Sequence, residues 1–190
     1  MNTHSILGLL SGILATVAFI PYIYSIVRNE TKPHPITWSI WAFIGIVSFG
    51  TYFATGATTT LPLALANIIV PLTIAFLSFK YWNWKARFTV FEYACLTISV
   101  ISIVIWIVSQ NPSLALTFNL IADFIAALPT LKKVYLDPSS ENATTWIIIV
   151  IADILSLFAI TEWSYGIVLL PLYFLLISTT IMLLSLRKRI

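Results

Sequence analysis

The sequence predicts an all-α membrane protein with seven transmembrane helices. The chain has 190 residues, of which 59% are apolar and only 9% are charged, whereas a soluble domain averages about 25% charged residues. A helix needs roughly 20 apolar residues to cross a bilayer core about 30 Å thick. The segments that meet this description are residues 5–27, 36–55, 61–79, 89–109, 114–131, 144–161 and 166–186. The connections between them are short, so we expect one bundle.

The distribution of basic residues predicts the orientation of this bundle. The ten lysines and arginines are Arg28, Lys32, Lys80, Lys85, Arg87, Lys132, Lys133, Arg187, Lys188 and Arg189. With seven helices, all of them fall on one side of the membrane. Basic residues mark the cytoplasmic side, so we expect the N-terminus outside and the C-terminus in the cytoplasm. The net charge of +3 then follows from topology, and we expect no nucleic-acid partner.

The segments, taken in order, contain an internal repeat. A shift of 108 residues places Pro21 on Pro129 and Thr37-Trp38 on Thr145-Trp146, with eight identities between residues 12–50 and 120–158. Each proline removes a backbone hydrogen bond near the end of its segment and should bend it. Segment 89–109 has no counterpart. The predicted domains are therefore a three-helix repeat at 1–79, a linker helix with flanking loops at 80–113 and a second three-helix repeat at 114–190.

One extra helix between the two units gives them the same orientation in the membrane. Such parallel repeats are related by an axis along the membrane normal, and they occur in transporters whose substrate sites lie near the midplane between the repeats. The arrangement, with a proline near the end of the first helix of each unit, resembles the PQ-loop superfamily over essentially the whole chain. Members of that superfamily include SWEET sugar transporters and lysosomal amino-acid exporters. The family's Pro-Gln dipeptide is replaced by Pro21-Tyr22 and Pro129-Thr130. The resemblance implies alternating access and a small polar solute.

Two acids stand alone in the apolar segments of the second unit. Asp123 lies about nine residues into segment 114–131, and Asp153 about eight residues from the outer end of segment 144–161. An intramembrane carboxylate is normally kept only where it faces protein or water. We expect both to line a central cavity and to bind solute, with one of them coupling transport to protons. The alternative is that each acid only bridges helices through a hydrogen bond.

Other polar and aromatic residues reach similar depths. Asn119 lies one turn before Asp123 on the same face, and Asn67 and Tyr173 complete the predicted substrate-binding set. The two asparagines are equally suited to hydrogen bonds between helices. Pro21 and Pro129 are the predicted hinges. Trp38 and Trp146 are candidates for gating or for anchoring at the interface, a depth that tryptophan favours in any membrane protein.

The sequence gives no indication of catalysis. No nucleophile, base and acid occur together, and no metal ligands cluster, so we expect no enzyme, no metal and no cofactor. We expect a transporter or facilitator for a sugar or an amino acid, with protons and lipid as its other partners. The alternatives are a carrier of a vitamin precursor such as nicotinamide riboside, or a non-transporting receptor or scaffold of related architecture. Homo-oligomer formation stays open.

Overall fold

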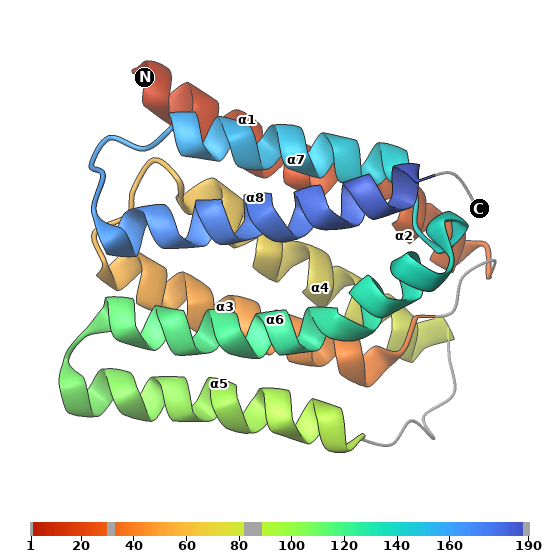
Figure 1. Ribbon diagram of the computed structural model, residues 1–190, viewed down its shortest axis with the longest axis horizontal. Helices are drawn as coiled ribbons and strands as arrows, with labels where there is room; N and C mark the ends of the chain where they lie inside the picture. The colour runs from red at the N-terminus through yellow and green to blue at the C-terminus, as the bar shows by residue number, and fades with distance from the viewer. Residues whose placement is uncertain (1, 30–32, 82–88, 188–190) are drawn as a thin grey trace.

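The fold is described here from a computed structural model of residues 2–29, 33–81 and 89–187. Within these ranges all regular structure is helical (Figure 1). The elements are α1 (Thr3–Val17), α2 (Ile20–Val27), α3 (Pro35–Ala54), α4 (Leu61–Tyr81), α5 (Val90–Ser109), α6 (Pro112–Leu136), the 3-10 helix η1 (Pro138–Ser140), α7 (Ala143–Phe158) and α8 (Tyr165–Leu186). Of the basic residues used to predict orientation, Lys32, Lys85, Arg87, Lys188 and Arg189 lie outside the described residues.

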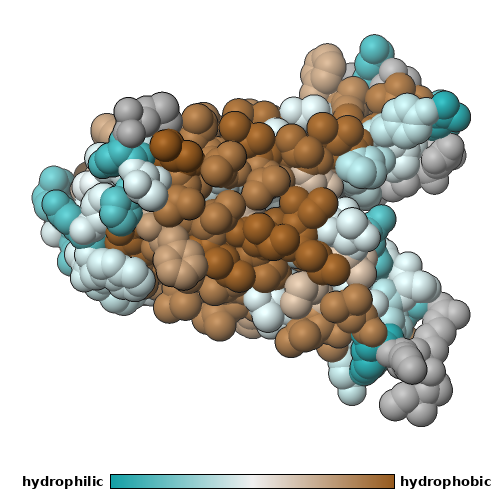
Figure 2. All heavy atoms as spheres, turned by 90° about the horizontal axis from the view of Figure 1, so that it is seen from above, coloured by the Kyte–Doolittle hydropathy of each residue, from teal (hydrophilic) through white to brown (hydrophobic). Residues whose placement is uncertain are grey.

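Six spans in the described part of the chain are long and apolar enough to cross a membrane. Figure 2 shows the matching surface, a broad hydrophobic band between two hydrophilic ends. The prediction of an all-α, multi-pass membrane protein is therefore confirmed. The remaining predicted segment, 144–161, is shorter than expected, because α7 has 16 residues and ends at Phe158. The chain turns there, so that Ile160 packs into a buried cluster at one end of the bundle.

The first predicted segment is interrupted as its proline predicts. It forms α1 and α2, which are separated at Ala18 and Phe19, and Pro21 occupies the first turn of α2. Proline fits a first turn because its missing N–H has no partner to lose there. Pro129, by contrast, lies inside α6, and Figure 1 shows the last part of α6 turning away from the line of its first part.

We call α1–α4 the first set of helices, and α6–α8 with η1 the second set. In each set the last helix packs against the other spans. In the first set, α4 packs against both α1 and α3; in the second set, α8 packs against both α6 and α7. The sets meet where α1 packs on α7 and where α3 packs on α6. Helix α5 lies at the edge of the bundle, against α6 and α3 (Figure 1).

A glycine permits close packing of α1 on α4. An added Cβ at Gly12 of α1 would lie 2.5 Å from the backbone oxygen of Pro62 in α4, closer than real side chains come. Gly50 of α3 has no such constraint, since the nearest atom to an added Cβ is 3.9 Å away. Gly12 therefore allows α1 to approach the backbone of α4 more closely than a larger residue would.

Candidate functional site

A cavity of about 1010 Å³ runs between the two sets of helices. Its walls come from α1, α2, α3 and α4 on one side and from α6, η1, α7 and α8 on the other. It reaches from the middle of the bundle to the end that holds η1 and the start of α7. Figure 2 shows the molecule hollowed at this end, with hydrophilic residues on both sides of the notch.

Both intramembrane acids reach this cavity, as their isolation in apolar helices predicts. Tyr173 Oη donates a hydrogen bond to Asp123 Oδ2 at 2.6 Å. Ser178 Oγ donates to Asp153 Oδ2 at 2.5 Å, and Asp153 is only 1% exposed. Both donors belong to α8, so this helix orients the two carboxylates. Each carboxylate has further lone pairs with which to accept hydrogen bonds.

The predicted substrate-binding residues divide into two groups. Asn67 lines the cavity beside the acids, and Tyr173 lies behind the wall and reaches it through Asp123. Asn119 differs from its prediction because it is fully buried away from the cavity. It accepts a hydrogen bond from Ser99 of α5 and donates to Ser48 Oγ at 2.7 Å and Ile44 O at 2.9 Å in α3. Asn119 therefore joins three helices by hydrogen bonds, which is the alternative role that we considered for the two asparagines.

Of the four predicted gate and hinge residues, three line the cavity and one does not. Trp38, Trp146 and Pro21 line the cavity, whereas Pro129 does not. Trp146 Nε1 donates to Glu141 Oε2 at 3.3 Å, and Lys133 Nζ lies 3.2 Å from Glu141 Oε1. These three side chains therefore form one polar cluster at the mouth.

Four aromatic residues form a continuous wall on the opposite side of the cavity. Trp38 contacts Trp41 with ring centroids 4.9 Å apart, Tyr22 at 5.7 Å and Phe19 at 6.4 Å. All four line the cavity. We define Phe19, Tyr22, Trp38 and Trp41 as the aromatic wall. The sequence predicted a role for Trp38 alone. Trp41 lies one turn further along α3, whereas Phe19 and Tyr22 come from the break between α1 and α2 and from α2.

A buried polar cluster beside the mouth was not predicted. Glu92 of α5 accepts a hydrogen bond from Thr37 at 2.7 Å, and its Oε1 lies 3.3 Å from Nδ1 of His34. Thr89 and Glu92 also form a capping box at the start of α5. The Thr-x-x-Glu pattern of a capping box is visible in the sequence. The contacts of Glu92 with Thr37 and His34 are not visible, because they join residues 55 and 58 positions apart.

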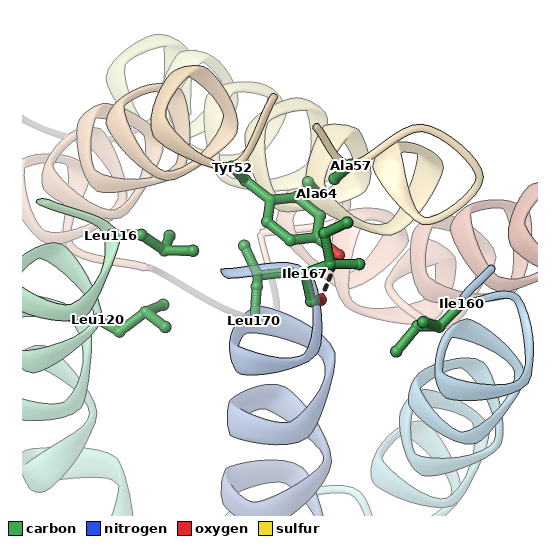
Figure 3. Packing of buried hydrophobic residues seen from close by; sticks show 8 residues of the cluster. All are labelled: Tyr52, Ala57, Ala64, Leu116, Leu120, Ile160, Ile167 and Leu170. Atoms are coloured by element: carbon green, nitrogen blue, oxygen red, sulfur yellow. Dashed lines mark hydrogen bonds between the residues drawn. The ribbon is translucent and has the colours of Figure 1, made fainter. Parts of the chain in front are cut away.

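The end of the bundle opposite the mouth is closed by a hydrophobic cluster (Figure 3). Its buried members are Tyr52, Ala57, Ala64, Leu116, Leu120, Ile160, Ile167 and Leu170. Tyr52 Oη donates to Ile167 O at 2.8 Å and shares a hydrogen bond with Thr60. Two further hydrogen bonds join the sets of helices at this end, from Thr59 Oγ1 to Ala159 O and between His4 Nδ1 and Phe158 O.

Comparisons of the chain with protein-family models, with curated proteins and with solved structures gave no match. The features of the protein that bear on its function are the cavity, its two acids and the closed end opposite its mouth.

Proposed function

We propose that this protein is a transporter or facilitator that moves a small polar solute across the membrane by alternating access. The observation that carries the proposal is a large cavity that is open at one end of the bundle, closed at the other and lined at its inner part by two carboxyl groups. Ligand sites in membrane transporters lie at this depth between two helical units. Intramembrane acids commonly mark substrate or proton pathways.

The two sets of helices are proposed to be parallel three-helix repeats joined by α5, as in the PQ-loop superfamily. We refer to the first and second sets of helices as the two halves of the protein. Support for the repeat comes from the cavity wall, because most residues of α1–α3 that line the cavity have counterparts in the second half, at a shift of 108 residues, that also line it. These pairs include Ala15 and Asp123, Phe19 and Ala127, Tyr22 and Thr130, Ser25 and Lys133, Thr37 and Thr145, Trp38 and Trp146, Trp41 and Ile149, and Gly45 and Asp153. In α4 and α8 the shift is 111: Leu63 and Phe174, Ala66 and Ile177, Asn67 and Ser178, and Val70 and Ile181.

Helix packing supports the same repeat. The shift converts the contact of α1 with α7 into the contact of α6 with α3, and both pairs pack together. It also converts the buried pair Ser11 and Ser156 into Asn119 and Ser48, the latter joined by a hydrogen bond. A two-fold axis along the membrane normal would produce these relations. The first half then carries Ala15 and Gly45 where the second carries Asp123 and Asp153.

The polar contacts around the closed end support a rocking motion. The bonds from Tyr52 to Ile167 and from Thr59 to Ala159 join the two halves there. At the mouth, Glu141 accepts its hydrogen bonds from Lys133 and Trp146 of its own half. Breaking the bonds of Tyr52 and Thr59 would open the closed end. The two halves would then approach each other at the mouth.

The mouth lies at the end that carries Arg28, Lys80, Lys132 and Lys133, so the proposed orientation has it facing the cytoplasm. Impermeant labelling of terminal tags in intact cells tests this. The N-terminal tag is expected to react from outside and the C-terminal tag only after permeabilisation. A cytoplasmic N-terminus would overturn the orientation.

Solute counterflow into proteoliposomes that contain the purified protein tests the function. A panel of labelled sugars, amino acids, nucleosides and amines is expected to contain at least one solute that exchanges. Asp123→Asn and Asp153→Asn keep size and remove charge, so at least one of them should abolish uptake driven by a pH gradient. Unchanged pH dependence in both would identify a facilitator with structural acids. A solute that binds the protein but is not carried across the membrane would favour the alternative of a non-transporting receptor.

A further inference from the structure

The charges that face the cavity define the kind of solute it accepts. The inner part of the wall carries Asp123 and Asp153, whose identified donors are the neutral hydroxyl groups of Tyr173 and Ser178. A hydroxyl group supplies a hydrogen bond but no compensating charge. The two acids therefore give the inner cavity a formal negative charge, which a proton or a cationic ligand would neutralise.

Among the described residues, the basic groups of the cavity wall lie at the mouth. Over the described ranges of the chain, the cavity wall contains one lysine, Lys133, no arginine and one histidine, His34. Lys133 already contacts Glu141, and its side chain is 58% exposed. His34 contacts Glu92. A carboxylate on a solute would thus meet no basic partner beside Asp123 and Asp153, and like charges at close range repel strongly where water is scarce.

The aromatic wall supplies a complementary surface. The faces of tryptophan, tyrosine and phenylalanine attract cations through the ring quadrupole, and tryptophan does so most strongly. Trp38 and Trp41 are both part of this wall, and their rings pack edge to face. The wall therefore provides apolar contact for a carbon skeleton and electrostatic attraction for a positive group.

We propose that the transported solute is a small organic cation without a carboxylate group. Its ammonium or quaternary ammonium group binds Asp123 and Asp153, and its carbon skeleton packs against the aromatic wall. A sugar would leave both carboxylates without a neutralising partner, and an amino acid would add a third carboxylate. This inference rests on the proposed transport function and narrows the solute class predicted from the sequence.

Matched sets of compounds test the inference on the unaltered protein. Tyramine, tyrosol and tyrosine share one skeleton and carry an ammonium group, a hydroxyl group, or both an ammonium and a carboxylate. Choline, 3,3-dimethylbutan-1-ol and glycine betaine form a second set with a quaternary centre. Calorimetric titration of the purified full chain is expected to give at least roughly tenfold tighter binding for the cation of one set than for its two analogues. Equal binding within both sets, or no binding of either cation, would overturn the inference.

Variants then identify the groups responsible. Asp123→Asn or Asp153→Asn should remove most of the preference for the cation, and Trp38→Leu should weaken cation binding more than binding of the neutral analogue. Glu162→Gln is the control, because Glu162 is an exposed acid outside the cavity and its loss should leave the preference unchanged. A preference that survives both aspartate substitutions would refute the assignment.

Uptake experiments separate this inference from the function on which it rests. Cation binding without counterflow would retain the ligand class and refute transport. Counterflow of a sugar or an amino acid in preference to both cations would retain transport and refute the ligand class.

Discussion

The hydroxyl group of Tyr52 links the two halves of the bundle at its closed end, and its removal tests alternating access directly. Tyr52 is fully buried, and its Oη donates to the carbonyl of Ile167 at 2.8 Å. That carbonyl lacks the usual helical donor, because the residue four positions later is Pro171, which has no N–H. The substitution Tyr52→Phe keeps the ring in the hydrophobic cluster and leaves the Ile167 carbonyl without a hydrogen bond.

The structure sets the size of the expected effect. Of the two hydrogen bonds of Tyr52, the one with Thr60 stays within the first half, so only the bond to Ile167 depends on closure. Side-chain hydrogen bonds in one membrane protein averaged about 0.6 kcal/mol with a maximum of about 1.7. We take the maximum for this bond because Pro171 supplies no N–H to the same carbonyl, and about 1.7 kcal/mol corresponds to roughly a 20-fold change in an equilibrium constant. Tyr52→Phe should therefore raise the population open at this end roughly 20-fold.

Cysteine labelling measures that population. Leu116→Cys, in a Cys95→Ala background, places one thiol in the closed cluster, where Leu116 is fully buried. An impermeant maleimide applied from the closed side should label it roughly 20-fold faster when Tyr52→Phe is added. Tyr165→Phe is the matched control, because its hydroxyl bonds to Thr117 within the second half. An unchanged labelling rate with Tyr52→Phe, or an equal increase with Tyr165→Phe, would refute a role of the Tyr52–Ile167 bond in closing this end.

Two further predictions concern stability, measured as the free energy of unfolding in detergent titrations. Gly12→Ala should destabilise the protein by about 1–3 kcal/mol, because the added methyl group meets helix backbone. Gly50→Ala should be neutral or slightly stabilising, since it has space and alanine favours helix. Asn119→Ala should cost about 2 kcal/mol, for three hydrogen bonds to other helices at about 0.6 kcal/mol each. Asn67→Ala should cost less, because the identified bond of Asn67 lies within its own helix; equal losses for the two asparagines would contradict this.

Composition and helix length predicted the fold class because membrane burial requires long apolar helices with internally satisfied backbones. The same rule predicted that Asp123 and Asp153 face the interior, since a lipid-exposed carboxylate has no partner. The break near Pro21 followed from its missing N–H, although the interruption begins earlier, at Ala18. These successes concern properties that one helix possesses by itself.

Properties that depend on neighbouring helices were harder to predict. Asn119 and Asp123 are one turn apart, yet residues at i and i+4 are rotated by about 40° around a helix. That rotation suffices for Asn119 to contact α3 and α5 while Asp123 contacts Tyr173 of α8. The end of α7 was placed too late because Ile160 is as apolar as a membrane residue, although it packs into the closed end. The sequence does not record which partner buries an apolar side chain.

The shortness of α7 has a consequence for the surrounding lipid. At 1.5 Å per residue its 16 residues span about 24 Å, compared with a hydrocarbon thickness of about 30 Å in an average bilayer. One face of α7, formed by Ile147, Ile151, Ile154 and Phe158, is exposed at the surface of the bundle. Hydrophobic mismatch of this kind is relieved by local thinning of the bilayer. Acyl chains beside α7 should therefore be compressed relative to those beside the six longer spans, so the bilayer around the protein should be thinnest at this face.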